Sequence, residues 1–120
     1  MTIPPDEDMD ASAVDLDALR QATGGDRDLM QELAELYVSD ADLQLRALGD
    51  ALQNNELDRL RRIGHALTGA SASIGAIRAA EIFRTLEHAA KAGDTDAIRD
   101  AIEEGRAEFV RIRRALADLR

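Results

Sequence analysis

A helical pattern runs through residues 56–71, which read ELDRLRRIGHALTGAS. An α-helix turns by about 100° per residue, so residues three and four apart gather on one side. That side collects apolar and small residues: Leu57, Leu60, Ile63, Gly64, Leu67, Ala70 and Ser71. The spacing predicts an amphipathic helix that buries this side, and the small residues Gly64 and Ser71 predict a close approach of a neighbouring helix.

His65 falls about 150° from the middle of that stripe, so we expect its ring to face solvent. A glycine inside an exposed helix costs about 1 kcal/mol relative to alanine, and Gly69 therefore needs a compensating role. The exposed neighbours of the histidine within about two turns are Arg61, Arg62, Thr68, Gly69 and Ala72. The small residues among them predict a clearing in which another protein can reach the imidazole.

The sequence before this helix predicts one short and one long helix. The short helix is expected over residues 14–22, with Gly24 as its stop. Asp26 can cap a helix that runs to about Gln53, and Asn55 is the expected cap of the histidine helix. The predicted inward residues of the long helix are Leu29, Leu33, Tyr37, Ala41, Leu45, Leu48 and Leu52.

Two more amphipathic helices follow the histidine helix. Residues 73–75 permit a new start, and the next helix turns inward Ala76, Ala79, Phe83, Leu86 and Ala90. Gly93 and Asp94 form a stop followed by a cap. The last stripe holds Ile98, Ile102, Gly105, Phe109, Ile112, Leu116 and Leu119. Short connections between four such helices predict an all-α fold, an antiparallel up-down four-helix bundle with a short additional N-terminal helix.

Length and composition predict one domain without a membrane anchor. A chain of 120 residues suits a single core, here residues 14–120, preceded by a disordered acidic arm over residues 1–13. The absence of cysteine removes disulfides and thiolate metal sites and fits a reducing cytosol. No apolar run approaches the roughly 20 residues that span a bilayer, and residues 1–10 are too acidic for a signal peptide. We therefore expect a cytoplasmic protein.

The charge distribution disfavours nucleic acid as a partner. The net charge is −9; residues 1–55 carry 13 acids and 3 bases, whereas residues 56–120 carry 11 acids and 12 bases. Nucleic-acid binding needs a basic surface, and stacking on single strands needs more aromatics than Tyr37, Phe83 and Phe109. The sequence favours a protein partner or a small anion held locally by arginines.

The chain lacks the motifs of an enzyme that uses ATP or a metal. No glycine-rich phosphate loop is present, and neither histidine has a second ligand three or four residues further along its helix. His88 also points outward, but its neighbours Glu81, Arg84 and Lys91 are long and charged. We interpret His88 as a solvated surface residue and predict no metal site.

Several segments together resemble the histidine-containing phosphotransfer (HPt) family. The resemblance is carried by His65-x-Leu67-x-Gly69-x-Ser71-x-x-Ile74-Gly75-Ala76 and by residues 86–94, LEHAAKAGD. Gly25-Asp26 before a helix with Leu29, Leu33, Leu36 and Tyr37 is similar too, so the resemblance covers roughly residues 14–119. The family usually has lysine three residues after the histidine, where this chain has Thr68.

The resemblance implies a phosphorelay intermediate of two-component signalling. His65 would accept a phosphoryl group from a receiver-domain aspartate, through the ring nitrogen farther from the backbone, and pass it to another receiver. The partners implied are response-regulator receiver domains, such as that of a hybrid histidine kinase. The receiver would bring Mg²⁺, and this chain would be a stoichiometric carrier without a cofactor of its own.

Five residues near His65 are candidates for phosphoryl or receiver docking: Arg61, Arg62, Thr68, Gly69 and Ala72. The two arginines could steady the phosphoryl group or steer the acidic pocket of the receiver. Thr68 keeps an alternative open, in which the protein is a non-phosphorylated HPt-like adaptor or kinase inhibitor. A purely structural helical scaffold is a third interpretation, which explains the apolar stripes but not the clearing.

Overall fold

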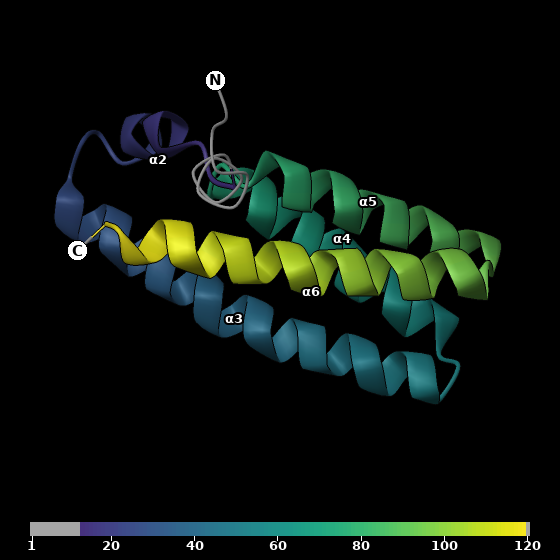
Figure 1. Ribbon diagram of the computed structural model, residues 1–120. Helices are drawn as coiled ribbons and strands as arrows, with labels where there is room; N and C mark the ends of the chain where they lie inside the picture. Colours follow the sequence, from purple (N-terminus) through teal and green to yellow (C-terminus); the bar gives the residue numbers. More distant parts are fainter. Residues whose placement is uncertain (1–12, 120) are drawn as a thin grey trace, which may run out of the picture.

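The computed structural model describes residues 13–119, which form five helices (Figure 1). A short helix, α2 (Leu16–Ala22), precedes four long ones: α3 (Arg27–Gln53), α4 (Leu57–Ser73), α5 (Ile77–Ala92) and α6 (Thr95–Ala117). The long helices lie side by side, and α2 sits at the end where α3 and α5 begin. The predicted all-α bundle with a short N-terminal helix is confirmed.

The long helices form a ring in chain order. Short turns make successive helices antiparallel, and α6 closes the ring by packing against both α5 and α3. The most extensive contact joins α4 to α5. In this arrangement α4 packs between α3 and α5, and the side of α4 that faces away from both helices is exposed to solvent.

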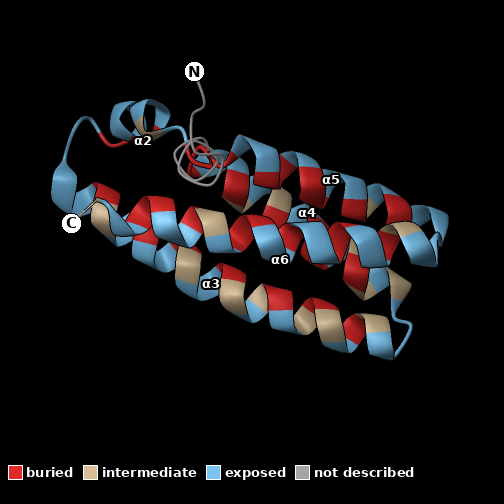
Figure 2. Ribbon diagram, in the orientation of Figure 1, coloured by how far each residue is buried: buried red, intermediate tan, exposed pale blue. Residues whose placement is uncertain are grey.

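The core lies on the facing sides of these helices, where buried residues gather (Figure 2). The largest fully buried side chains include Leu48, Leu60, Leu67, Phe83, Leu86, Ile98 and Ile112. Burying one such side chain stabilises the fold by about 1.5–3 kcal/mol. Each helix therefore turns inward the face on which the 3.6-residue periodicity of the sequence gathers its apolar side chains. Tyr37 and Ser71 add one buried hydrogen bond of 2.9 Å between α3 and α4.

Two glycines set the spacing of α5 from its neighbours. A Cβ on Gly105 of α6 would lie 2.7 Å from Cε1 of Phe83, and one on Gly64 of α4 would lie 3.2 Å from the backbone nitrogen of Glu87. Both distances are shorter than ordinary carbon contacts, so side chains at these positions would push the helices apart. The predicted inward packing of Gly64 and Gly105 is confirmed.

The helix ends follow the capping signals at two of three predicted positions. The side chain of Asp26 accepts a hydrogen bond from the backbone N–H of Leu29, and Asp94 does the same for Ala97. Gly93 ends α5 with a φ of 72°, a conformation that glycine adopts without strain.

The prediction that Asn55 caps the histidine helix is wrong. Glu56 occupies the N-cap position of α4 and makes no side-chain capping bond. Asn55 instead has a φ of 54°, because the chain must reverse within a few residues between α3 and α4. Asparagine tolerates this left-handed conformation better than most residues. Asn55 therefore serves the turn through its backbone conformation and not through its side chain.

The inward face predicted for the first turns of α3 is also wrong. Leu29 and Leu33 are each 38% exposed, while Met30 and Ala34, one position further along, are buried. Both pairs have the same four-residue spacing, so the periodicity alone could not choose between them. Further along α3, Tyr37, Ala41, Leu45 and Leu48 are buried as predicted.

The segment before α2 is tied to the turn between α4 and α5. The backbone N–H of Asp15 donates to the carbonyl oxygen of Gly75 at 2.8 Å, and Ala13 and Val14 are buried. A Cβ on Gly75 would lie 2.7 Å from the carbonyl oxygen of Asp15, so this contact needs glycine. Ala13 was predicted in the acidic arm but packs in the core; the rest of that arm, residues 1–12, lies outside the described residues.

No helix within residues 13–119 has both the length and the apolar character needed to cross a membrane.

Two alanine substitutions isolate the packing role of Gly105. Gly105→Ala and Gly69→Ala gain the same helix propensity, up to about 1 kcal/mol, but only Gly105→Ala meets a buried ring. Overpacking of this kind typically costs about 1–3 kcal/mol. We expect the free energy of unfolding, measured in urea, to be lower for Gly105→Ala than for Gly69→Ala by that amount. Equal stabilities would show that the α5–α6 spacing is not set by Gly105.

Candidate functional site

His65 stands on the outer face of α4, as the sequence predicted. Its side chain is 76% exposed, while Gly64 and Leu67 on the same helix are buried. The ring is therefore held near the middle of the length of a rigid helix, and a second molecule can reach it from solvent.

One nitrogen of the His65 ring is bound to the neighbouring helix. Nδ1 lies 3.1 Å from Oε2 and 3.4 Å from Oε1 of Glu87 on α5. A carboxylate can only accept a hydrogen bond, so Nδ1 carries the proton in this pair. In the neutral ring the lone pair is then on Nε2, which becomes the nucleophilic nitrogen.

Gly64 explains how Glu87 reaches the histidine. The missing side chain at Gly64 lets α4 approach the backbone of α5 at Phe83 and Glu87. Glu87 is 21% exposed, so its stem is largely covered while its carboxylate meets the ring. A larger residue at position 64 would move the two helices apart and lengthen this hydrogen bond.

The clearing beside His65 is present. A Cβ on Gly69 would meet no atom within 4 Å, and both Gly69 and Ala72 are exposed. These residues lie one and two turns beyond His65 in the direction of the helix C-terminus. A partner can therefore come close to the backbone of α4 on this flank of the ring.

Thr68 contributes no group to the clearing. Its Oγ1 donates a 2.7 Å hydrogen bond to the carbonyl oxygen of Gly64, and the residue is half-buried. A threonine on a helix satisfies its hydroxyl in this way without a ligand. The position where the family usually has lysine thus carries a hydroxyl that is bound to its own helix.

Arg61 and Arg62 both bind Asp58 rather than extending freely toward the ring. Arg61 Nη2 lies 2.9 Å from Oδ1 of Asp58, and Arg62 Nε lies 3.3 Å from Oδ2. The hydrogen bond from Arg61, with the charges of both arginines, holds the pKa of Asp58 below its usual value. All three residues lie on the same face as His65, on its N-terminal side.

An apolar groove lies beside the C-terminal half of α4. It measures about 440 Å³ between α2, α3 and α4 and is lined by Leu19, Leu33, Leu36, Tyr37, Asp40, Ala70, Ser73 and Ile74. Leu36 is 61% exposed and Leu33 is 38% exposed, so large apolar side chains remain uncovered here. The groove borders the same end of α4 as Gly69 and Ala72.

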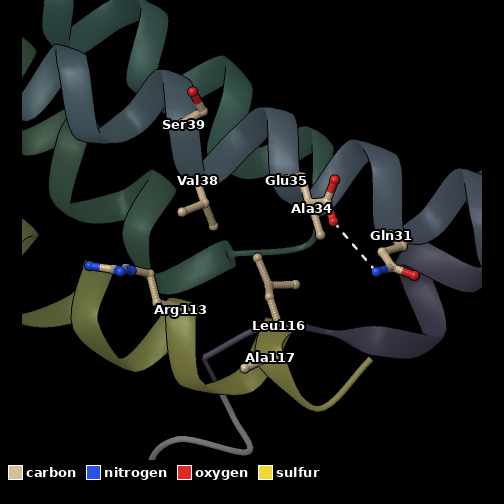
Figure 3. A pocket seen from close by; sticks show the side chains of 8 residues that line it. All are labelled: Gln31, Ala34, Glu35, Val38, Ser39, Arg113, Leu116 and Ala117. Carbon is tan, nitrogen blue, oxygen red and sulfur yellow. Dashed lines mark hydrogen bonds between the residues drawn. The ribbon is translucent and has the colours of Figure 1, made fainter. Parts of the chain in front are cut away.

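Other places in the structure offer less chemistry. A hollow of about 320 Å³ lies between α3 and α6, where Val38 and Leu116 face each other (Figure 3). Its lining includes Gln31, Glu35 and Arg113 but no histidine. His88 is exposed on α5, and within residues 13–119 no three His, Cys, Asp or Glu side chains converge as a metal site would require.

Sequence reasoning missed two residues of the site. The bond from Glu87 to His65 spans 22 positions of the chain, and no local pattern predicts a contact between helices at that distance. Asp58 could have been found, because its spacing of three and four residues from Arg61 and Arg62 is the spacing of helical ion pairs.

Comparison with known proteins identifies the family and supports the fold. The crystal structure of histidine-containing phosphotransfer protein B (HptB) from Pseudomonas aeruginosa PAO1 is similar, with a TM-score of 0.84 and 28% sequence identity. The similarity covers 90% of this chain and 94% of that chain. No curated protein matches. The family model of the Hpt domain matches residues 32–120, and the chain therefore belongs to the Hpt domain family.

Proposed function

We propose that His65 accepts a phosphoryl group from the phosphorylated aspartate of a receiver domain and passes it to a second receiver. The observation that carries this proposal is an exposed imidazole with Nδ1 bound to Glu87 and open space beside it at Gly69. The hydrogen bond orients a nucleophile, and the open flank admits the partner that brings the phosphoryl group.

The first transfer needs no proton from solvent. Nε2 attacks the phosphorus atom, and the bond between phosphorus and the aspartate oxygen breaks, so the carboxylate leaves with the electron pair. Nδ1 keeps its proton, and the phosphorylated ring is a cation beside the Glu87 carboxylate. Glu87 thereby stabilises the charge that the ring acquires on phosphorylation.

The second transfer reverses these changes. The carboxylate of another receiver attacks phosphorus, the bond between phosphorus and Nε2 breaks, and the electron pair returns to Nε2. The ring leaves as neutral imidazole with its proton still on Nδ1. His65 is thus restored after each cycle, which is the behaviour of a stoichiometric carrier. We assign the Mg²⁺ that neutralises charge on the transferring phosphoryl group to the receiver.

The groove beside α4 supports a docking surface for the receiver. The small residues Gly69 and Ala72 leave the ring accessible. Leu33 and Leu36 offer apolar surface in the groove that Ala70 and Ser73 of the same helix also line. Uncovered apolar side chains next to a reactive group are typical of a protein interaction site. We propose that apolar side chains of the receiver cover this groove while its aspartate reaches Nε2.

A non-phosphorylated adaptor is the second candidate function, and Thr68 is the observation that favours it. Its hydroxyl is committed to the backbone of Gly64, so position 68 offers no cation to a phosphoryl group. An exposed charge at that site would be worth about 1 kcal/mol, which changes a rate severalfold and does not abolish the reaction. The carrier function is therefore compatible with threonine.

Substitution of each histidine separates the two candidates. We expect a phosphorylated receiver to label wild type and His88→Gln equally and to leave His65→Gln unlabelled, because His65 alone has the hydrogen bond and the clearing. The label should be labile in acid and stable in alkali, as expected for an N-phosphate. Labelling of His65→Gln would refute the assignment, and a wild type inert toward every receiver of its own genome would favour the adaptor.

Removal of the Glu87 carboxylate should slow transfer without unfolding the protein. Glu87→Ala loses a charge-assisted hydrogen bond at a mostly exposed ring, worth about 1 kcal/mol, so the rate should fall roughly 3- to 10-fold. Glu81→Ala on the exposed side of the same helix is the matched control and should transfer normally. Nitrogen NMR of His65 should show the Nδ1–H form in wild type and a mixture of both neutral forms in Glu87→Ala. If Glu87→Ala had the same proportion of the two neutral forms as wild type and the same transfer rate, Glu87 would have no part in the mechanism.

A side chain at position 69 should block docking while leaving the fold intact. Gly69→Gln improves helix propensity by up to about 1 kcal/mol but fills the open flank of the ring. We expect equal or higher thermal stability and slower transfer from the receiver. Gly69→Ala is the control of smaller volume and should be slowed less. Normal transfer by Gly69→Gln would contradict the clearing as a docking feature.

A further inference from the structure

The charges on the N-terminal side of His65 form a small cluster centred on Asp58. Arg61 and Arg62 come four and three residues before the histidine, and Asp58 comes three and four residues before the arginines. Both arginines bind Asp58, at 2.9 and 3.3 Å. Each arginine therefore stands one helical turn from Asp58 on one side and one turn from His65 on the other.

Exposure makes these ion pairs easy to exchange. The side chains of Asp58 and Arg62 are 70% and 67% exposed, and that of Arg61 is 41% exposed. Ion pairs in water are weak, and long arginine side chains change rotamer at low cost in such positions. A phosphoryl group on Nε2 would place several oxygens and more negative charge than one carboxylate within reach of the same guanidinium groups.

The neighbouring helices add charges of both signs. On α5, Glu87 adds a negative charge at the ring, and Arg84 and Lys91 lie one turn to either side of it in the sequence. On α3, the acidic residue that borders the groove is Asp40. Arg61 and Arg62 are the cations on the helix of His65 itself within one turn of the ring.

We propose that Asp58 competes with the phosphoryl group of His65 for Arg61 and Arg62, and that Asp58 thereby limits how strongly this protein holds its phosphoryl group. In the free protein the arginines bind Asp58. In the phosphorylated protein they divide between Asp58 and the phosphoryl oxygens. Asp58 would keep the phosphoryl group transferable, because full neutralisation by two arginines would favour its retention on His65. The proposal rests on His65 as the phosphorylated residue.

Chemical phosphorylation tests the competition without a receiver. Phosphoramidate loads the histidine directly: the bond between phosphorus and nitrogen in phosphoramidate breaks, ammonia leaves, and a bond forms between phosphorus and Nε2. Full-length protein with His88→Gln gives a single phosphohistidine. Phosphorus NMR at a series of pH values then measures the pH at which the phosphoryl monoanion becomes the dianion. Four forms are compared: the background protein, Asp58→Asn, Arg61→Gln with Arg62→Gln, and the triple variant.

The expected result is a shift that depends on the arginines. Asp58→Asn releases both guanidinium groups to the phosphoryl dianion, so its protonation should move to lower pH by roughly 0.2–0.7 units at low salt. In the variant without the two arginines, Asp58→Asn should produce less than half of that shift. Asp100→Asn on α6, a helix that packs on α3 and α5, should produce none. Salt at 1 M should shrink the shift.

Equal shifts from Asp58→Asn with and without the arginines would overturn the proposal, since Asp58 would then act on the phosphoryl group by direct repulsion alone. Failure of phosphoramidate to load His65 would overturn it as well. A protein that shows the arginine-dependent shift but takes no phosphoryl group from any receiver would support the competition and refute the relay function, so the two outcomes remain distinguishable.

Discussion

The close approach of α4 and α5 at Gly64 is the constraint on which the site depends. A Cβ at this position would lie 3.2–3.4 Å from three backbone atoms of α5, none of which can move without the whole helix. The contact brings Glu87 to within 3.1 Å of the His65 ring on the adjacent residue of α4. The packing of α4 against α5 therefore determines which nitrogen of the exposed His65 ring carries the proton and which keeps its lone pair. Gly105 serves the same purpose on the other side of α5, where Phe83 fills the space that its missing side chain leaves.

Much of the fold could be predicted because its information is local. Helix existence, the stop at Gly93 and the caps at Asp26 and Asp94 follow from the periodicity and capping chemistry of a few neighbouring residues. The errors arose where two local rules gave equal answers. Leu29 and Met30 begin stripes of the same spacing, and the packing of the other helices against α3 decides which one is buried. Asn55 can cap a helix or take a left-handed turn, and the reversal between α3 and α4 selects the turn.

In the candidate site, too, the features that depend on one helix could be predicted and those that depend on helix packing could not. The exposure of His65 and the open space at Gly69 depend on the face of a single helix, and the sequence predicts both. Glu87 belongs to another helix, so its bond to His65 required the packed structure. The ion pairs of Arg61 and Arg62 with Asp58 were not predicted for a third reason. Charge counted along a sequence does not show which partner each charged side chain binds.

The arrangement around His65 suits a carrier that has to give up what it accepts. A site that bound the phosphoryl group tightly would use buried arginines and fixed backbone donors, which lower the energy of the bound state as well as that of the transition state. Here Arg61 and Arg62 are paired in water, and the hydroxyl of Thr68 is bound to its own helix. Glu87 makes a direct hydrogen bond to the ring. In the proposed function, the bundle fixes the direction of the His65 ring and the receiver supplies most of the charge stabilisation. In the proposed function, transfer in both directions would depend on the receiver that docks beside His65, as a phosphoryl carrier between two proteins requires.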